Sequence, residues 1–559
     1  MKHSKLITGL LAALLTATVS SQAQLSYIDT HSDETRKIAM IVEGKPFFPN
    51  VGELSICRFF DETLFNWSDD EIEAVIQQIK ADGYTTVKMP YYWGQLEVSK
   101  DVYDWSMLEK SIDFCVQANL PLIFNFWGSE FVTASWIYDG LLPKYVMTDY
   151  DYVLDKDGNR VEVNYHYHLD KRSYPKLDKC DDRLRAREAH VLKTIMNHIR
   201  AYIDEKGYPD IVIGVQLQNE PTIDRLFSIN AGNRSYSESA NEKWNSRDWP
   251  DAYSFNNTVM FEYLNELGRA VKESDYPVWT MVNYMSGRNG FFRVDGVCPE
   301  YVFSQNEVAR AKGESYIDFL GMDIYRDNPQ DFVDILTDRY IIQGRNYPHI
   351  PETSAGFDNV NHIFFTVLAH NGTMGFWEYL SSGDWHWAYE KTLYVPTEDN
   401  GFKAFDEIKL KRVQDFNHFL LKNRTALATY KAGGTNLKYF NVGWVPYAEE
   451  RQQLGKVNIQ YKTLVGSGGI ASLNEDGAVV LMSTDFATYT LHTPNGVKSA
   501  EVGHYDEDDV WHKTGEINES YDAEIEAIKA ADWNQKGFVI YTRPYDCVRV
   551  TLNEASNDQ

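Results

Sequence analysis

Two glutamates stand where a short apolar run of the sequence gives way to polar residues. Glu220 lies in Gln-Leu-Gln-Asn-Glu-Pro at residues 216–221, and Glu352 lies in Ile-Pro-Glu-Thr-Ser at residues 350–354. Cleavage of a glycosidic bond needs two carboxyl groups: one protonates the departing oxygen, and the other attacks the anomeric carbon or activates a water. Asn219 could hydrogen-bond the sugar 2-hydroxyl, a contact that tightens in the transition state. The pair predicts Glu220 as general acid/base and Glu352 as nucleophile.

The elements that must position this pair alternate between β-rich apolar runs and helical patterns from about residue 40 to residue 425. Such alternation is typical of βα units around a parallel sheet. The predicted strands are residues 47–56, 85–90, 120–126, 211–218, 278–283, 319–324, 349–351 and 373–377. Eight strands are what a (β/α)8 TIM barrel needs, and reacting residues lie at the C-terminal strand ends of such barrels. Glu220 and Glu352 end the fourth and seventh runs, so they could converge over one mouth.

The sequence divides into three parts. A basic start, a short apolar run and the small residues at 21–23 make residues 1–23 typical of a secretory signal peptide. Residues 24–430 carry the alternating pattern and form the predicted catalytic barrel. After residue 430 helical periodicity largely disappears, and short β-rich runs predict a C-terminal β-sandwich accessory domain over residues 431–559. The signal predicts a secreted or periplasmic protein.

Composition limits the classes of partner. Lysine and arginine number 54 against 81 acids, a net charge of −27, which repels phosphate backbones and argues against nucleic acid. After the signal region no run of about 18 apolar residues occurs, so we expect no membrane insertion. Trp and Tyr are abundant, at 14 and 36, and suit stacking on sugar rings. The five cysteines are scattered and odd in number, which gives no disulfide framework and no zinc motif. The expected chemistry requires no metal and no organic cofactor.

Several segments carry a family resemblance over about residues 45–380. They are Gly-Glu-Leu-Ser-Ile-Cys-Arg-Phe at 52–59, Met-Pro-Tyr-Tyr-Trp at 89–93, Tyr-Asp-Trp-Ser at 103–106 and Gln-Leu-Gln-Asn-Glu at 216–220. With them the chain resembles the clan A glycoside hydrolases, and within the clan the family 35 and family 42 β-galactosidases. The resemblance implies an exo-acting, retaining enzyme with Glu220 as acid/base. The chain departs from family 35 after the second and third strands, and the segment around Glu352 is only loosely like either family's nucleophile motif.

Further side chains at the strand ends are predicted to bind substrate. Tyr325 ends the sixth run, where clan members often place a residue that hydrogen-bonds the nucleophile, and Tyr284 competes for that role. Trp377 resembles the platform under the sugar in the −1 subsite. Arg58 could hold the nucleophile ionised or contact the substrate. Hydroxyls of the terminal sugar are expected to meet Asn125, Trp127 and Glu130.

Glu378 is the main rival to Glu352 as nucleophile. It follows Trp377 directly, and because side chains alternate along a strand, it turns away from the mouth if Trp377 faces in. Glu53 and Glu97 are weaker candidates for the site.

The sequence thus predicts a retaining exo-glycoside hydrolase that cleaves terminal β-linked sugars, β-galactosides first, by double displacement through a glycosyl-enzyme. An oligosaccharide or polysaccharide is the expected partner. One alternative is an endo-acting β-glycanase, which the insertions at 133–180 and 222–255 disfavour because such loops can wall a pocket. The other is a non-catalytic glycan-binding protein on a barrel scaffold, although a degenerate member would lose one carboxylate. The C-terminal domain either braces the barrel or binds glycan.

Overall fold

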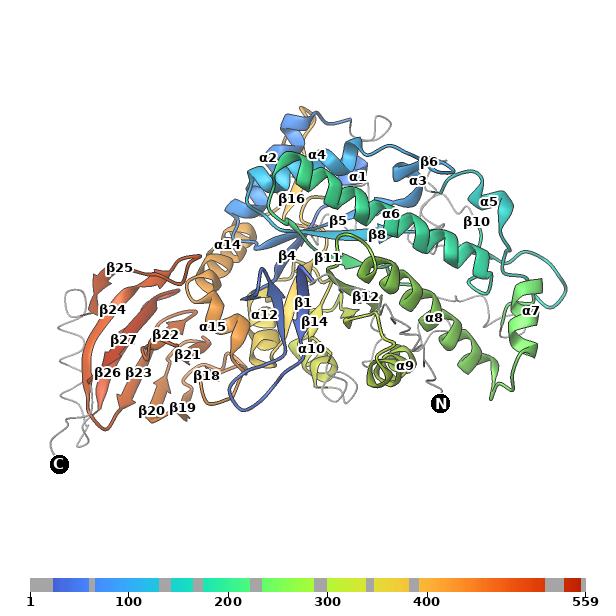
Figure 1. Ribbon diagram of the computed structural model, residues 1–559. Coiled ribbons are helices and arrows are strands. Elements are labelled where there is room, and N and C mark those ends of the chain that lie inside the picture. The colour runs from blue at the N-terminus through green and yellow to red at the C-terminus, as the bar shows by residue number, and fades with distance from the viewer. Residues whose placement is uncertain are drawn as a thin grey trace, which may run out of the picture.

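A computed structural model gives the fold of the protein (Figure 1). It describes residues 24–59, 66–129, 142–163, 174–221, 234–285, 299–337, 346–381, 392–517 and 537–553.

The centre of the molecule is a sheet of eight strands, all parallel, in the order β13-β12-β11-β8-β5-β4-β15-β14. The end strands β13 and β14 lie side by side: the Ile324 N–H donates to the Glu352 carbonyl at 2.9 Å. A side chain at Gly321 would overlap the Pro351 ring, so glycine permits this close approach. The eight predicted runs all hold a strand, which confirms the barrel. In chain order the strands are β4 (Asn50–Glu53), β5 (Thr86–Tyr92), β8 (Leu122–Trp127), β11 (Val212–Gln216), β12 (Trp279–Met285), β13 (Phe319–Asp323), β14 (His349–Ile350) and β15 (Thr373–Phe376).

Helices cover the outside of this barrel (Figure 1). In α2 the Ser68 side chain caps the backbone of Glu71, which caps Ser68 in return, and residues at helical spacing such as Ile72 and Ile76 face the core. Gly83 follows the helix with φ +81°, a conformation that glycine adopts freely. The longer helices are α2 (Asp69–Ala81), α4 (Ser106–Gln117), α6 (Asp182–Lys206), α7 (Glu238–Asn245), α8 (Ala252–Lys272), α9 (Pro299–Lys312), α10 (Pro329–Leu336), α12 (Val360–Ala369) and α14 (Glu407–Leu421).

The N-terminal end of the barrel is closed by a small antiparallel sheet of β1 (Ser26–Asp29), β2 (Ala39–Val42) and β3 (Lys45–Phe47). Ile28 and Met40 from this sheet join one apolar cluster with inward residues of the barrel, namely Val51, Ile123, Ile213, Trp279, Met281 and Phe319. This plug was not predicted. It leaves the C-terminal strand ends as the polar end of the barrel.

Two antiparallel sheets form the C-terminal β-sandwich, as predicted. One has the order β18-β21-β22-β27-β24-β25 and the other β19-β20-β23-β26. Residues from both sheets fill the space between them, including Phe440, Tyr461, Leu481, Tyr489 and Ile540. The strands are β18 (Leu437–Phe440), β19 (Glu449–Leu454), β20 (Val457–Lys462), β21 (Gly469–Leu473), β22 (Val479–Ser483), β23 (Ala487–His492), β24 (Val497–Tyr505), β25 (Trp511–Glu516), β26 (Phe538–Thr542) and β27 (Cys547–Leu552).

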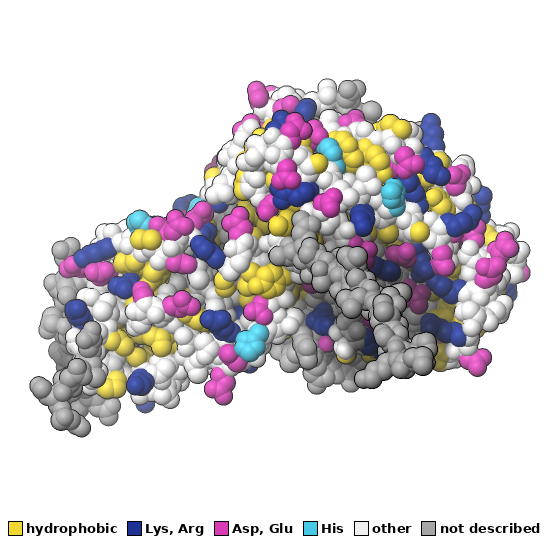
Figure 2. All heavy atoms as spheres, viewed as in Figure 1, with side chains coloured by type: hydrophobic (Ala, Val, Ile, Leu, Met, Phe, Trp, Pro, Cys, Tyr) yellow, Lys and Arg dark blue, Asp and Glu magenta, His cyan; other side chains and the backbone are white. Residues whose placement is uncertain are grey.

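The sandwich packs directly against the barrel. Phe365 of α12 lies 5.4 Å, centroid to centroid, from Tyr439 of β18, and both belong to the apolar cluster that fills the barrel's helical layer. Because the core is continuous here, the division at residue 430 stays a prediction. On the face shown in Figure 2, acidic and basic side chains are interspersed over barrel and sandwich. Among the described residues, none of the helices has the length and apolarity required to cross a bilayer.

Candidate active site

The inward side chains of the barrel change from apolar to polar toward the C-terminal strand ends. Two residues beyond the apolar Val51, Ile123 and Met281 come Glu53, Asn125 and Asn283 on the same strands. Since side chains two apart share a face of a strand, these polar residues point into the barrel above its apolar layer. All three are 1% exposed or less. The barrel therefore holds a buried polar layer at its mouth.

Glu352, directly after β14, accepts three hydrogen bonds in this layer. Its Oε1 accepts from Lys88 Nζ at 3.1 Å and from Asn283 Nδ2 at 3.0 Å, and its Oε2 accepts from the Tyr325 hydroxyl at 2.7 Å. The side chain is buried. Donors on both oxygens, one of them cationic, suit an ionised carboxylate held in a fixed orientation.

Glu220 is held at the mouth by its backbone. Its φ of +44° lies in the left-handed region, which costs energy for a residue other than glycine and is common at functional sites. The Glu220 N–H donates to Asn283 Oδ1 at 2.9 Å. Asn219, beside it, accepts from Asn283 Nδ2 at 3.1 Å and from Gln216 Nε2 at 3.3 Å. Glu220 is only partly buried, so its backbone is fixed while its carboxyl group stays accessible.

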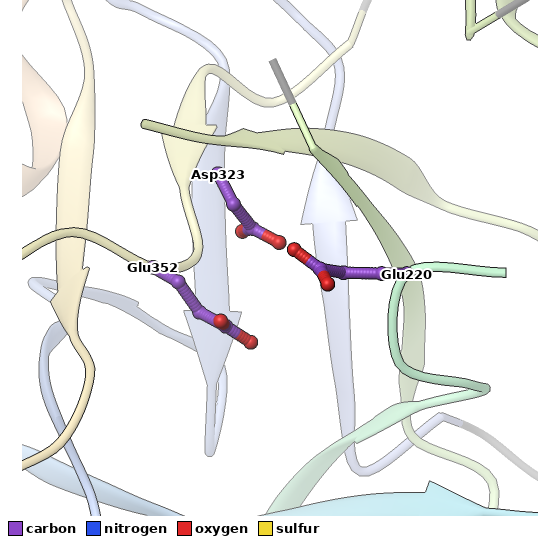
Figure 3. A group of neighbouring side chains, drawn as sticks. All are labelled: Glu220, Asp323 and Glu352. Atoms are coloured by element: carbon purple, nitrogen blue, oxygen red, sulfur yellow. The ribbon is translucent and has the colours of Figure 1, made fainter. Parts of the chain in front are cut away.

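A third carboxyl group lies between the two glutamates. Glu220, Asp323 and Glu352 each place one carboxyl oxygen within 4.8 Å of the others (Figure 3). Two full charges at that distance repel by about 3.5 kcal/mol at the effective dielectric constant of protein sites. Burial, and then the charges of Glu352 and Glu220, raise the pKa of Asp323 well above its usual range. The close approach of the three carboxyl groups therefore favours a protonated Asp323.

Within the part of the chain that the structure describes, Lys88 supplies the positive charge of this layer. Its Nζ lies 2.6 Å from Glu53 Oε2 and also reaches Glu352 and Gln216, at 3.1 and 3.3 Å. Burial raises the pKa of Glu53 to about 8 in spite of this pairing. Although burial opposes it, the charges of Glu352 and Glu53 raise the pKa of Lys88. One ammonium group thus serves two buried carboxyl groups.

Protons suit the three-carboxyl cluster better than a metal ion does. Three oxygens within 4.8 Å could approach one cation. However, Lys88 and Asn283 already donate to Glu352, and Asn283 Nδ2 also donates to Asp323 Oδ2 at 2.7 Å. A metal ion would have to displace these donors and share the site with an ammonium group.

Glu378 lies apart from this cluster. It is 1% exposed, and the Ser55 hydroxyl donates to its Oε1. Trp377, which precedes it, is half-buried and meets the Tyr325 ring edge-on at 6.1 Å between centroids. The tryptophan therefore adjoins the residue that bonds Glu352, as expected of a residue lining the mouth.

Of the other predicted site residues, Asn125 and Trp127 face the mouth, Tyr284 does not, and the remaining two have side chains outside the described residues. Asn125 is fully buried, and within the described part of the chain neither atom of its amide has a hydrogen-bond partner. Trp127 faces the same way two residues on, against Tyr92 at 4.9 Å. Tyr284 is not brought to the mouth: it follows the inward Asn283 and is buried in the core beneath the helices. The side chain of Arg58 and all of Glu130 lie outside the described residues.

Glu97, a weaker candidate, is an anchor inside the fold. Its carboxyl group accepts from Trp93 Nε1 at 2.6 Å and from the Tyr145 hydroxyl at 2.8 Å, and it pairs with Arg187. These partners hold the segment after β5 against α6.

Four central residues were missed or passed over by the sequence reasoning: Lys88, Gln216, Asn283 and Asp323. Two of them carry a signal in the sequence, because Asn283 is the last residue of the fifth predicted run and Asp323 lies one residue before the end of the sixth. Lys88 is the lone charge in a predicted strand that is otherwise uncharged, Thr-Thr-Val-Lys-Met-Pro at 85–90, and a lysine that is buried there needs a buried partner.

Comparison with known proteins gives distant structural likenesses. No family model and no curated protein matches the sequence. A β-galactosidase from the psychrophilic Marinomonas ef1 aligns with 67% of this chain and 60% of its own, at 12% identity and TM-score 0.44. One from the Antarctic haloarchaeon Halorubrum lacusprofundi aligns over 67% and 58%, at 15% identity and TM-score 0.44. A family 30 subfamily 8 xylanase from Clostridium acetobutylicum aligns over 90% and 95%, at 11% identity and TM-score 0.38.

This chain therefore spans less than two thirds of the length of those two β-galactosidases. Likenesses at this distance do not identify the chemistry of the chain, and they leave its resemblance to family 35 a prediction. Its activity has to be inferred from the geometry of the mouth.

Proposed function

We propose that this protein is a retaining glycoside hydrolase that removes terminal β-linked sugars, with β-galactosides as the first substrates to test. The separation of Glu220 and Glu352 carries the proposal: one oxygen of each lies within 4.8 Å of the other at the strand ends of a barrel. Retaining glycosidases hold their two carboxyl groups about 5–5.5 Å apart, whereas inverting ones need about 6.5–9.5 Å to seat a water. The short separation supports double displacement.

The environments of the two groups support different roles. Glu352 is buried and bonded on both oxygens, so it is the nucleophile that attacks the anomeric carbon. Glu220 is partly exposed, so it can give its proton to the departing oxygen and then take one from the water that hydrolyses the glycosyl-enzyme. Asn219, held by Asn283, is in place to bond the sugar 2-hydroxyl.

Asn125 supports a polar ligand in the same mouth. A buried amide without a partner costs free energy, so a sugar hydroxyl or a water is expected to bond it. Trp377 and Trp127 supply the aromatic surface that a sugar ring needs. We also propose that residues 1–23 export the protein, which its N-terminal sequence after secretion would test.

The decisive experiment is a screen of nitrophenyl β-glycosides followed by NMR of the first product. Release of the β-anomer from a β-glycoside is expected, and release of the α-anomer would overturn retention. Glu220→Gln should slow natural glycosides by about 10²–10⁴-fold while sparing attack on activated aryl glycosides. Hydrolysis of an internal polysaccharide bond, with no aryl glycoside turned over, would favour the endo-acting alternative.

The nucleophile is identified by covalent trapping. A 2-deoxy-2-fluoro glycoside with an activated leaving group should label Glu352, and Glu352→Ala should not be labelled. Glu378→Ala is the matched control, because Glu378 is equally buried but bonded to Ser55. A label on Glu378 would exchange the two assignments.

A further inference from the structure

We propose that Asp323 acts as a neutral carboxylic acid that donates a hydrogen bond to Glu220 in both halves of the reaction. It would thereby position the acid/base and stabilise its ionised form. The inference rests on the role proposed for Glu220, and one of its tests needs no turnover.

Asp323 faces Glu220, and among the described residues only one of its two carboxyl oxygens has a hydrogen-bond donor. It is fully buried at the end of β13, and its carboxyl group points toward that of Glu220 (Figure 3). Its Oδ2 accepts from Asn283 Nδ2 at 2.7 Å, whereas its Oδ1 has no hydrogen-bond donor among the described residues. A buried carboxyl oxygen that faces a second carboxyl group needs a proton between them.

The two carboxyl groups are held in this relation by one amide. Asn283 Oδ1 accepts from the Glu220 N–H at 2.9 Å, while Asn283 Nδ2 donates to Asp323. The Glu220 backbone adopts φ +44° and is held by its hydrogen bond to Asn283, which fixes the position from which the side chain extends toward Asp323. The fold thus maintains a contact that would be repulsive if both groups were ionised.

Nearby charges leave Asp323 as the group that keeps its proton. Among the described residues Lys88 is the cation nearby, and although its charge lowers the pKa of Asp323, it forms its ion pairs with Glu53 and Glu352. On the side of β14 a carboxyl oxygen of Glu352 lies within 4.8 Å of one of Asp323, and Glu352 Oε2 accepts from the Tyr325 hydroxyl. Burial and these negative charges raise the pKa of Asp323 well above its usual range, so the acid stays neutral at working pH.

Asp323 holds one proton in both steps of the reaction, and Glu220 makes the proton transfers. In glycosylation Glu220 gives its own proton to the glycosidic oxygen as Glu352 bonds the anomeric carbon. Asp323 keeps its proton, and its hydrogen bond to the new Glu220 carboxylate becomes charge-assisted and stronger. In deglycosylation Glu220 takes a proton from the attacking water. Asp323 is therefore a positioning residue that exchanges no proton.

Two substitutions separate this role from a structural one. Asp323→Asn keeps a donor in place of the acid, so it should retain kcat/KM within about threefold and leave the basic limb of the pH profile in place. Asp323→Ala removes the donor, so kcat/KM should fall about tenfold or more and the basic limb should move up by about one pH unit. Asp318→Asn, at the opposite end of the same strand and paired with Lys272, is the matched control.

A downward shift of the basic limb in Asp323→Asn would overturn the proposal, because it would mean that an ionised Asp323 had kept Glu220 protonated. An unchanged limb in Asp323→Ala would overturn it as well. Circular dichroism and labelling with the fluoro sugar show whether each variant is folded.

Infrared difference spectroscopy tests the proton without any substrate. The spectrum of the wild-type protein minus Asp323→Asn should contain the carbonyl stretch of a neutral carboxylic acid near neutral pH, shifted in D₂O. A carboxylate band in its place would overturn the proposal. If the protein hydrolyses no glycoside, this measurement still decides the protonation of Asp323, so the two proposals fail separately.

Discussion

Replacement of Lys88 by methionine should destabilise the protein strongly, because this ammonium group lies between two buried carboxyl groups. The Lys88 side chain is 2% exposed, and its partners Glu53 and Glu352 are 1% and 6% exposed at their side chains. Methionine keeps the length and apolar character of the stem but removes the charge. Both carboxyl groups would then lose their cation without gaining access to water.

The expected loss is about 3–5 kcal/mol of unfolding free energy near neutral pH, the usual cost of breaking a buried ion pair from one side. Protonation of Glu53 limits it, since burial already raises the pKa of that group to about 8. The unfolded chain is common to both proteins, so the loss depends on pH only where the two folded proteins hold different numbers of protons. Glu53 of the folded wild type keeps its proton up to about pH 8, so the loss should be larger at about pH 9 than at about pH 7.

Urea unfolding followed by tryptophan fluorescence measures the change at both pH values. Lys37→Met is the matched control: Lys37 is 5% exposed but forms no ion pair in the described part of the chain, and burial lowers its pKa to about 7. That variant should lose little or gain stability. Adding Glu53→Gln to Lys88→Met should restore part of the loss. A Lys88→Met variant within about 1 kcal/mol of wild type at neutral pH would refute the reasoning.

Three further predictions concern the barrel and its mouth. Glu53→Gln should become more stable relative to wild type as pH rises from 4.5 to about 8, because over this range the unfolded wild-type chain releases the Glu53 proton while the folded protein retains it. Urea unfolding across this range measures the difference. Gly128→Ala should lower the free energy of unfolding by about 1–3 kcal/mol or more, because a Cβ there would overlap the Glu188 carboxyl group. Gly515→Ala, which has open space around it, should change that free energy little in the same assay. Tyr325→Phe removes the 2.7 Å hydrogen bond to the proposed nucleophile and should lower kcat/KM on aryl glycosides about 10–100-fold, and an unchanged value would remove the tyrosine from the mechanism.

The barrel was predictable because each strand is a short apolar run bounded by polar residues. Even β14, only His349–Ile350 in the structure, was found by counting strands rather than by its own length. The same count placed Glu352 at a strand end. The N-terminal plug was not predictable in this way, because residues 26–47 pack against strands that come far later in the chain.

The contacts within the mouth could not be predicted from the sequence, for a different reason. Tyr284 and Tyr325 both end predicted strands, and their difference depends on which face of each strand turns inward. A one-residue change of register exchanges the faces, and apolar runs buried on both sides do not reveal it. Because Asn283 faces inward, Tyr284 next to it faces outward, and this orientation is fixed only once the barrel is closed.

The carboxyl groups of the mouth are distinguished by their surroundings rather than by their type. Lys88 is one cation among four acids: Glu53, Glu220, Asp323 and Glu352. Burial favours the protonated forms of Glu53 and Asp323, and the charge of Lys88 opposes this at Glu53, while three donors suit Glu352 to a negative charge. Glu220 alone of the four is partly exposed, so it is the one that can exchange a proton with a ligand or with water. A pair of acids pushed toward opposite protonation states by their environments is what acid/base and nucleophilic roles require, and in the described part of this barrel Lys88 supplies the positive charge that favours the ionised form of Glu352.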